Sequence, residues 1–200
     1  MIVIGVTGSI GMGKTTVAAM FAEEGAWVWN ADAAVHRLYE RGGEAVEAIR
    51  ARFPDAVVAD AVDRDRLAAQ VVSDAPALAD LEAIVHPMVA EDRALFITNA
   101  ARQGADIVVL DIPLLFEKGG EKFLDAVVVA SAPPEVQRQR VLSRPGMSEK
   151  KFRAILMKQT PDAEKRRRAD YVVRTGLTLD ETRAEVRAVV ADLKRRFQIE

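Results

Sequence analysis

Eight consecutive residues near the N-terminus have the types and spacing best suited to chemistry. The segment 8–15, GSIGMGKT, matches G-x-x-x-x-G-K-[ST] at every constrained position. Glycines let a backbone wrap closely around a polyphosphate with its N–H groups directed inward, a lysine reaches the β and γ phosphates, and a threonine hydroxyl binds Mg²⁺. The segment therefore predicts a site for ATP and Mg²⁺ that includes Gly8, Ser9, Ile10, Gly11, Met12, Gly13, Lys14, Thr15 and Thr16.

The alternative interpretation of this segment is a glycine-rich turn with a chance lysine. Its context favours phosphate binding, because the segment follows the apolar run 2–6 and opens a helix whose positive N-terminal end would face an anion. The D-x-x-G and N-K-x-D motifs of GTPases are absent, and the apolar run 107–110 continues Asp-Ile-Pro rather than Asp-Glu, the ending usual in motor ATPases. These observations favour a small-molecule kinase, which needs a carboxylate near the transferred phosphate and arginines to neutralise its charge.

Two aspartates are candidates for that carboxylate and for metal binding. Asp32 follows the apolar run 26–29, and Asp111 follows the run 107–110. Because ligands of parallel sheets bind beyond the carboxyl ends of the strands, both would lie at the edge that carries the phosphate loop. Asp32 is either a catalytic base or the N-cap of a helix that starts at Ala33, and position alone does not separate the two roles. Asp111 is either the holder of a magnesium-bound water or a turn residue at a strand end.

Arginines cluster on the predicted helix 134–144. Arg138, Arg140 and Arg144 lie on it, and we expect Arg140 and Arg144 to share one face because they are four positions apart. A solvated charged surface is the default interpretation. The adjacent Pro145-Gly146 break favours a lid that closes over ATP, with Arg140 and Arg144 on its phosphates.

The remaining charged candidates have simpler interpretations. The run Lys165-Arg166-Arg167-Arg168 is expected on the surface, although one of its arginines would be able to reach a phosphate. His86 precedes Pro87 at a predicted helix end, where capping or packing is as plausible as substrate binding, and His36 is expected on a helix surface.

The elements that position these residues follow from hydrophobic periodicity. Uninterrupted apolar runs predict five strands that are buried on both faces of a parallel sheet, at 2–6, 26–29, 107–110, 126–130 and 171–173. Periodic apolar residues predict helices at 15–24, 44–53, 65–72, 77–85, 134–144 and 179–197, and a polar helical stretch up to 168. Pro87 and Gly104 are expected to mark boundaries. The sequence therefore predicts an α/β fold with a parallel sheet flanked by helices, a helical insertion at about 33–105 and a short charged insertion at about 143–168.

Composition excludes several kinds of site. The chain of 200 residues has a net charge of −2, no cysteine and two histidines. Disulfides, a cysteine nucleophile and a His-rich metal site are excluded, and general nucleic-acid binding is not favoured. There is no apolar run near the roughly 20 residues of a membrane span and no secretory signal pattern, so we expect a cytoplasmic protein that acts without a membrane.

Beyond the phosphate loop, segments along almost the whole chain resemble the dephospho-CoA kinase family. The His-Pro pair and the Asp-Ile-Pro-Leu-Leu-Phe-Glu segment are the most specific of them. The similar segments are 6–18, Asn30-Ala31-Asp32, Val62-Asp63-Arg64 with Leu67, Leu81-Glu82, His86-Pro87, 111–117, Gln137, Arg140-Val141, Arg144, Gln159 and 169–173.

The resemblance implies a P-loop nucleoside-kinase-like fold in three parts. The nucleotide-binding core would be 1–32, 106–142 and 169–200, the helical acceptor-side domain 33–105, and the lid 143–168. It implies ATP-dependent phosphorylation of the ribose 3′-hydroxyl of dephospho-CoA, which is the last step of coenzyme A synthesis, by a monomer or weak homo-oligomer. The residues that it implies are Asp32 as catalytic base, Lys14 and Arg140 on the transferring phosphate, Asp32, Arg64, His86 and Leu114 on the acceptor, and Thr15 and Asp111 at the metal.

The chain departs from the family pattern at two places. Asn30 replaces the first aspartate of Asp-Ala-Asp, and Arg174-Thr175-Gly176 replaces a segment that often carries an asparagine on the adenine side.

Two alternatives to this function are a P-loop kinase for a nucleoside monophosphate or a small sugar-like alcohol, and a nucleotide-sensing protein that binds a protein partner. The helical insertion favours a bulky acceptor and so argues against the small-acceptor kinase. The arginines near the lid favour catalysis and so argue against the nucleotide-sensing protein.

Overall fold

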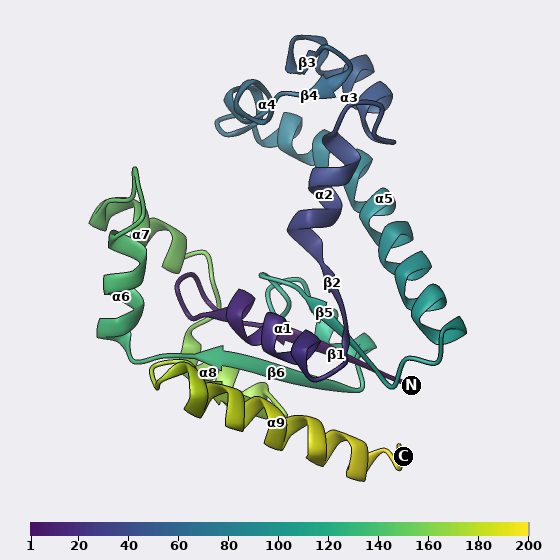
Figure 1. Ribbon diagram of the computed structural model, residues 1–200. Helices are drawn as coiled ribbons and strands as arrows, with labels where there is room; N and C mark the ends of the chain where they lie inside the picture. The colour runs from purple at the N-terminus through teal and green to yellow at the C-terminus, as the bar shows by residue number, and fades with distance from the viewer. Residues whose placement is uncertain (200) are drawn as a thin grey trace. The chain divides into compact units, whose positions relative to one another are not determined.

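The computed structural model describes residues 1–199. Within these residues the chain forms two compact units, one of 1–29 together with 100–199 and one of 30–99 (Figure 1). The strands are β1 (Ile2–Thr7), β2 (Trp27–Asn30), β3 (Val57–Val58), β4 (Ala61–Val62), β5 (Ile107–Asp111), β6 (Ala126–Ser131) and β7 (Tyr171–Arg174). The helices are α1 (Lys14–Glu23), α2 (Ala31–Tyr39), α3 (Val46–Arg52), α4 (Arg64–Val71), α5 (Ala75–Arg102), α6 (Pro134–Leu142), α7 (Glu149–Leu156), α8 (Asp162–Arg168) and α9 (Leu179–Arg196). Short 3₁₀ turns occur at Pro54–Ala56 and Gly120–Phe123.

A five-stranded sheet in the order β2-β5-β1-β6-β7 forms the centre of the first unit. β1 pairs in parallel with β5 and β6, and β6 pairs in parallel with β7. β1, β5 and β6 are mostly apolar and buried, as expected for strands covered on both faces, whereas Val172 and Arg174 of the edge strand β7 are exposed. The register places Val6 opposite Asp111, so the carboxyl ends of β1 and β5 lie together. The predicted α/β fold with a parallel sheet is confirmed.

Helices α1 and α9 pack together on one face of this sheet. Phe21 of α1 and Leu193 of α9 share a buried core with Ile4, Val6 and Val128 of the strands. This apolar burial is the main source of the packing free energy. Because α1 is fixed on the sheet, the loop between β1 and α1 starts and ends at rigid points.

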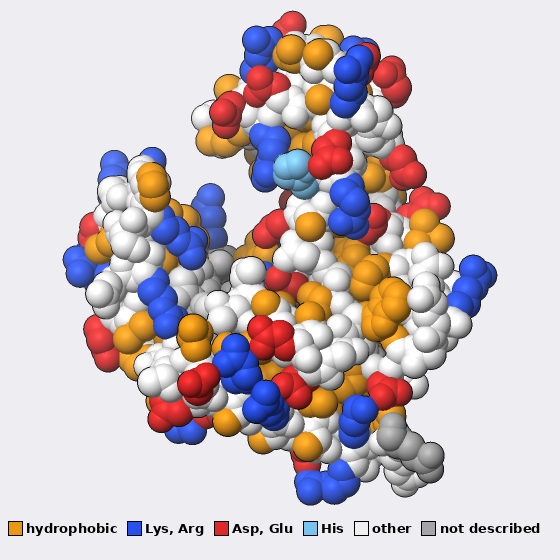
Figure 2. Space-filling model, viewed as in Figure 1, with side chains coloured by type: hydrophobic (Ala, Val, Ile, Leu, Met, Phe, Trp, Pro, Cys, Tyr) orange, Lys and Arg blue, Asp and Glu red, His pale blue; other side chains and the backbone are white. Residues whose placement is uncertain are grey.

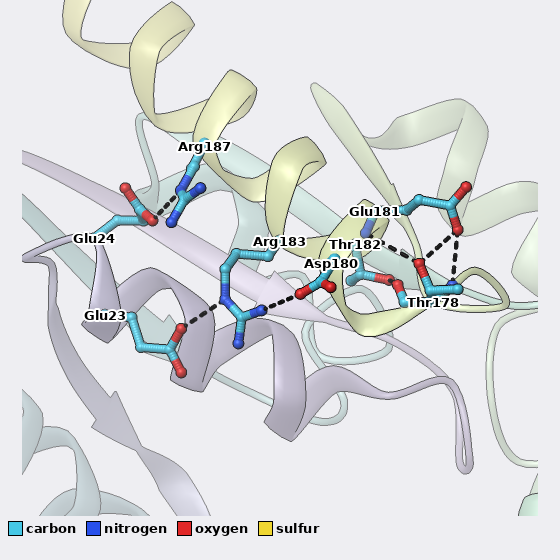
Figure 3. A network of polar contacts seen from close by, with 8 residues as sticks. All are labelled: Glu23, Glu24, Thr178, Asp180, Glu181, Thr182, Arg183 and Arg187. Carbon is cyan, nitrogen blue, oxygen red and sulfur yellow. Dashed lines mark hydrogen bonds and ion pairs between the residues drawn. The ribbon is translucent and has the colours of Figure 1, made fainter.

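Polar contacts fix the start of α9 and its position on α1. Thr178 and Glu181 form a capping box in which each side chain accepts a hydrogen bond from the other's backbone N–H (Figure 3). Figure 3 also shows the ion pairs that join the two helices, Arg183 to Glu23 at 3.0 Å and Arg187 to Glu24 at 2.7 Å. Exposed ion pairs of this kind contribute little stability, so they mainly set the helix register.

The unit 30–99 has its own hydrophobic core. Leu38, Ile49, Phe53, Leu67 and Val85 pack together from α2 to α5. The antiparallel hairpin of β3 and β4 was not expected in this mostly helical stretch, since two-residue strands leave no periodicity to detect.

Pro87 lies inside α5, so the predicted helix end at His86-Pro87 is wrong. The residues on both sides of Pro87, Val85 and Met88 among them, pack into the core of this unit. That burial outweighs the cost of the one intrahelical hydrogen bond that proline removes. Gly104, with a φ of 72°, lies just beyond the end of α5 as predicted.

The segment after α6 differs from its prediction in two respects. α6 ends at Leu142, so Arg144 lies beyond the helix and does not share a helix face with Arg140. The polar stretch up to 168 is two helices, α7 and α8, separated around Pro161. Proline restricts the residue before it to extended conformations, which explains why one helix does not run through. No helix within residues 1–199 combines the length and apolar character that a membrane span requires.

Candidate active site

The predicted phosphate loop connects the end of β1 to the start of α1. Gly11 and Gly13 have φ values of 77° and 81°, which side-chain-bearing residues rarely adopt. A Cβ atom on Gly8 would lie 2.7 Å from the carbonyl oxygen of Ala130, and one on Gly13 would lie 3.0 Å from Thr175. The glycines are therefore required by the packing of the loop against β6 and the residue after β7 as well as by any ligand.

Lys14, in the first turn of α1, forms an ion pair with Asp111 at the end of β5. The Asp111 side chain is 1% exposed and that of Lys14 is 13% exposed. Burial strengthens this attraction, because the local dielectric constant is lower than that of water. The structure thus places the two charged residues of the predicted phosphate and metal sites at the same sheet edge.

Thr175, which follows β7, connects Arg140 to the loop. The Thr175 hydroxyl donates to the carbonyl oxygen of Met12 at 2.7 Å. Arg140 donates to the Thr175 hydroxyl at 3.2 Å and to its carbonyl oxygen at 2.6 Å. Arg140 is therefore held beside the loop. Sequence reasoning missed Thr175, although its place after a strand, at the sheet edge that binds ligands, was a usable signal.

Lys165 corrects the prediction that the run 165–168 is a plain surface. Its side chain is fully buried, and its Nζ lies 2.9 Å from Oε1 of Glu117. The same Oε1 accepts a hydrogen bond from the backbone N–H of Thr160 at 2.7 Å. Burial alone raises the pKa of Glu117, but the contacts with Lys165 and Thr160 outweigh it and lower the pKa of this carboxyl. Arg168 instead pairs at the surface with Glu121 and Glu164.

Three predicted residues lie in the unit 30–99 and are all exposed. Asp32 is in the first turn of α2, Arg64 begins α4, and His86 is in the middle of α5, where its Nε2 lies 3.9 Å from Oε1 of Glu82. The alternative role of Asp32 as a helix N-cap is wrong. Asn30 is the N-cap, and its Oδ1 accepts a hydrogen bond from the backbone N–H of Ala33 at 2.8 Å.

The first unit contains the other predicted residues. The loop, Lys14, Asp111 and Arg140 come together there through the contacts described above. Leu114 follows β5 and is partly exposed, and Arg144 is exposed beyond α6.

The oxygen donors of the loop region fit Mg²⁺. Thr15, an exposed residue in the first turn of α1, carries a hydroxyl, and Asp111 supplies a carboxylate. Across residues 1–199 there is no group of three or more acidic or histidine side chains that would form a metal cage. This arrangement suits Mg²⁺ as kinases use it, since that ion keeps several waters and takes most other ligands from the substrate's phosphates.

Comparisons with known proteins extend over both units. The family model described as dephospho-CoA kinase matches residues 2–181. The chain is 55% identical over 194 residues to the dephospho-CoA kinase of Mesorhizobium japonicum, which covers 97% of this chain and 98% of that protein. A crystal structure from Thermus thermophilus is similar at 40% identity and a TM-score of 0.79, with 96% of this chain and 97% of that chain covered. The dephospho-CoA kinase from Campylobacter jejuni shares the fold, at 23% identity and a TM-score of 0.66 over 96% of each chain.

Proposed function

The chain belongs to the dephospho-CoA kinase family, and we propose from this premise that it transfers the γ-phosphoryl group of ATP to the ribose 3′-hydroxyl of dephospho-CoA. The products are coenzyme A and ADP. The observation that carries the proposal is the extent of the family match, which spans the phosphate loop and the whole of the unit 30–99. A match to the loop alone would support ATP binding and leave the acceptor open.

The loop region supplies the charge that phosphoryl transfer needs. The inward N–H groups of the loop and the N-terminal end of α1 bind the phosphates of ATP. Lys14 exchanges its Asp111 partner for the β and γ phosphates, and Arg140 neutralises charge on the transferring group. Thr15 and, through water, Asp111 would hold Mg²⁺, which reduces the repulsion between the phosphates and the attacking oxygen.

The acceptor side supplies the proton acceptor. Asp32 orients the 3′-hydroxyl of dephospho-CoA and takes its proton late in the reaction. The 3′-oxygen forms a bond to the γ-phosphorus while the bond from that phosphorus to the β–γ bridging oxygen breaks, so ADP leaves with the electron pair. Asn30 retains the capping role at the start of α2 and thereby supports the position of Asp32. Arg64, His86 and Leu114 bind the rest of the acceptor.

The segment 143–168 acts as a lid over ATP in this proposal, and α6 leads into it. Figure 2 shows Lys and Arg side chains on both edges of the projection formed by α6 and α7. A surface rich in cations suits closure over a polyphosphate. We further propose a cytoplasmic enzyme that acts as a monomer or weak homo-oligomer and without nucleic acid.

An acceptor comparison tests the proposed function. ADP release from ATP and Mg²⁺ is measured with dephospho-CoA, with adenylate, with pantetheine phosphate and without acceptor, and each product is identified by mass. The proposal predicts a product that gains one phosphate with dephospho-CoA only. ADP release that is independent of dephospho-CoA, in a protein that still binds ATP, would overturn the acceptor assignment and leave the loop assignment intact.

A further inference from the structure

The two peptide groups on either side of Ile10 in the phosphate loop are each held by a glutamine side chain. The backbone N–H of Ile10 donates to Oε1 of Gln159 at 3.0 Å. The carbonyl oxygen of Ile10 accepts from Nε2 of Gln137 at 2.7 Å. We call this pair of contacts the Ile10 clamp. It uses both backbone polar groups of Ile10, so it fixes the orientation of the Ser9–Ile10 and Ile10–Gly11 peptide groups within the loop.

Each glutamine of the clamp is itself rigidly placed. Gln137 is in α6 and 6% exposed, and the loop packs directly on that helix. A Cβ atom on Gly11 would lie 2.5 Å from Cγ2 of Val141 and 3.0 Å from the carbonyl oxygen of Gln137. Gln159 precedes Thr160, whose N–H donates to Glu117. Glu117 in turn pairs with the buried Lys165.

One glutamine lies on the helix that leads into the proposed lid, and the other lies within the lid. Gln137 is in α6, before the lid segment 143–168, and Gln159 lies between α7 and α8 of that segment. The helix that leads into the lid and the lid itself are therefore both bonded to the backbone of Ile10 in the phosphate loop. A displacement of α6, or of the lid around Gln159, acts on the loop through Ile10, and the loop in turn restrains both.

We propose that Gln137 and Gln159 are positioning residues that hold the phosphate loop in its ATP-binding conformation and couple the lid to it. The proposal rests on the proposed phosphoryl transfer from ATP, because the loop amides must be aimed at the phosphates before reaction to stabilise the developing charge. Neither glutamine touches the reacting atoms in this account. They act through the orientation of the two peptide groups that flank Ile10 and of the amides that follow them in the chain.

The first test removes each contact with a side chain of similar size. Gln137→Leu, Gln159→Leu and the double variant are compared with Gln139→Leu, which changes an exposed glutamine on the same helix. Each clamp variant is expected to lower kcat/KM for ATP by about 10–100-fold, a loss typical of small displacements in an active site. The KM for dephospho-CoA should stay unchanged. The kcat/KM of the double variant should be only slightly lower than that of the less active single variant, because the clamp fails when either contact is lost.

A charge-matched pair separates the clamp from general damage to the fold. Gln159→Glu keeps an acceptor for the Ile10 N–H, whereas Gln137→Glu replaces a donor with a carboxylate that faces the Ile10 carbonyl oxygen. Both add one negative charge near the loop. Gln159→Glu is expected to retain at least about 10-fold more activity than Gln137→Glu, a gap in the range reported for misplaced active-site groups.

ATP affinity measured calorimetrically without acceptor tests the clamp independently of the acceptor. The affinity should weaken in both leucine variants and stay unchanged in Gln139→Leu. Unchanged ATP affinity and kcat/KM in the leucine variants, or equal activities in the two glutamate variants, would overturn the proposal. Failure of the acceptor assignment would instead appear as a wild-type protein that binds ATP and does not phosphorylate dephospho-CoA.

Discussion

The phosphate-loop region and the unit 30–99 hold their functional side chains in different ways. Around the loop, Lys14, Arg140 and Thr175 are fixed by ion pairs and hydrogen bonds to partners distant in sequence. In the other unit, the predicted acceptor residues Asp32 and His86 are exposed. A phosphate-binding site gains from donors that are fixed in advance. The surroundings of an exposed carboxylate such as Asp32 are completed only when the acceptor binds.

This difference predicts distinct consequences of mutation. Changes around the loop should affect ATP binding and stability together, because the contacts that position the loop are buried parts of the fold. Changes at the exposed acceptor residues should affect turnover and leave stability unchanged, since surface substitutions rarely alter stability by more than about 0.5 kcal/mol.

The largest expected effect is at Lys14. Lys14→Met should lower kcat/KM by about 10³-fold, because it removes a charged donor from the transferring phosphate. It should also lower the free energy of unfolding by about 3 kcal/mol, since the buried Asp111 carboxylate loses its cationic partner. Kinetics and urea unfolding measure the two effects. Lost activity with unchanged stability would contradict the coupling of binding and fold in this region.

At Asp32, a substitution should lower activity and leave stability unchanged. Asp32→Asn is expected to lower kcat by about 10²-fold or more, as the proton acceptor is lost. ATP affinity and unfolding should remain as in the wild type, because the side chain is exposed. The matched control is Asp65→Asn, another exposed aspartate in a first helical turn of the same unit. Near-normal turnover of Asp32→Asn would remove this residue from the role of base.

A smaller effect is expected at Thr175, whose hydroxyl contacts the phosphate loop. Thr175→Val keeps the size of the side chain and removes the hydrogen bond to Met12 and one partner of Arg140. ATP affinity should weaken by about 10-fold, as expected for a small displacement of the loop. Thr175→Ser keeps the hydroxyl and serves as control. Equal ATP affinities in the two variants would show that the hydroxyl does not position the loop.

The smallest effect concerns the pH dependence of stability. Since the pKa of Glu117 is lower in the folded protein than its ordinary value of 4.5, the unfolded state binds more protons below that pH. The stabilisation is fully present above pH 4.5 and is lost as the pH falls through the lowered folded pKa. The double variant Glu117→Gln/Lys165→Met, which removes both charges, should lose less stability on acidification. Thermal unfolding of both proteins from pH 6 to pH 3 measures this difference, and parallel profiles would contradict it.

The strands and the loop were predictable because they depend on residues close together in the sequence. Apolar runs identified the strands, and the spacing of Gly8, Gly13 and Lys14 identified the loop. Lys165 and Thr175 escaped prediction because their burial depends on partners distant in the chain. Pro87 was misread because tertiary packing of α5 outweighs a local helix-breaking signal. The roles assigned to Asp32, Arg64 and His86 stay predictions until the variants are measured.

The position of the transferred phosphate tests the central claim most directly. The protein is incubated with ATP, Mg²⁺ and dephospho-CoA, and the product is examined by phosphorus NMR with detection of coupling to the ribose protons. The account predicts a new phosphate coupled to the proton at the 3′-carbon, with one ADP formed per product. A phosphate on any other group of dephospho-CoA, or ADP formed without a phosphorylated acceptor, would contradict it.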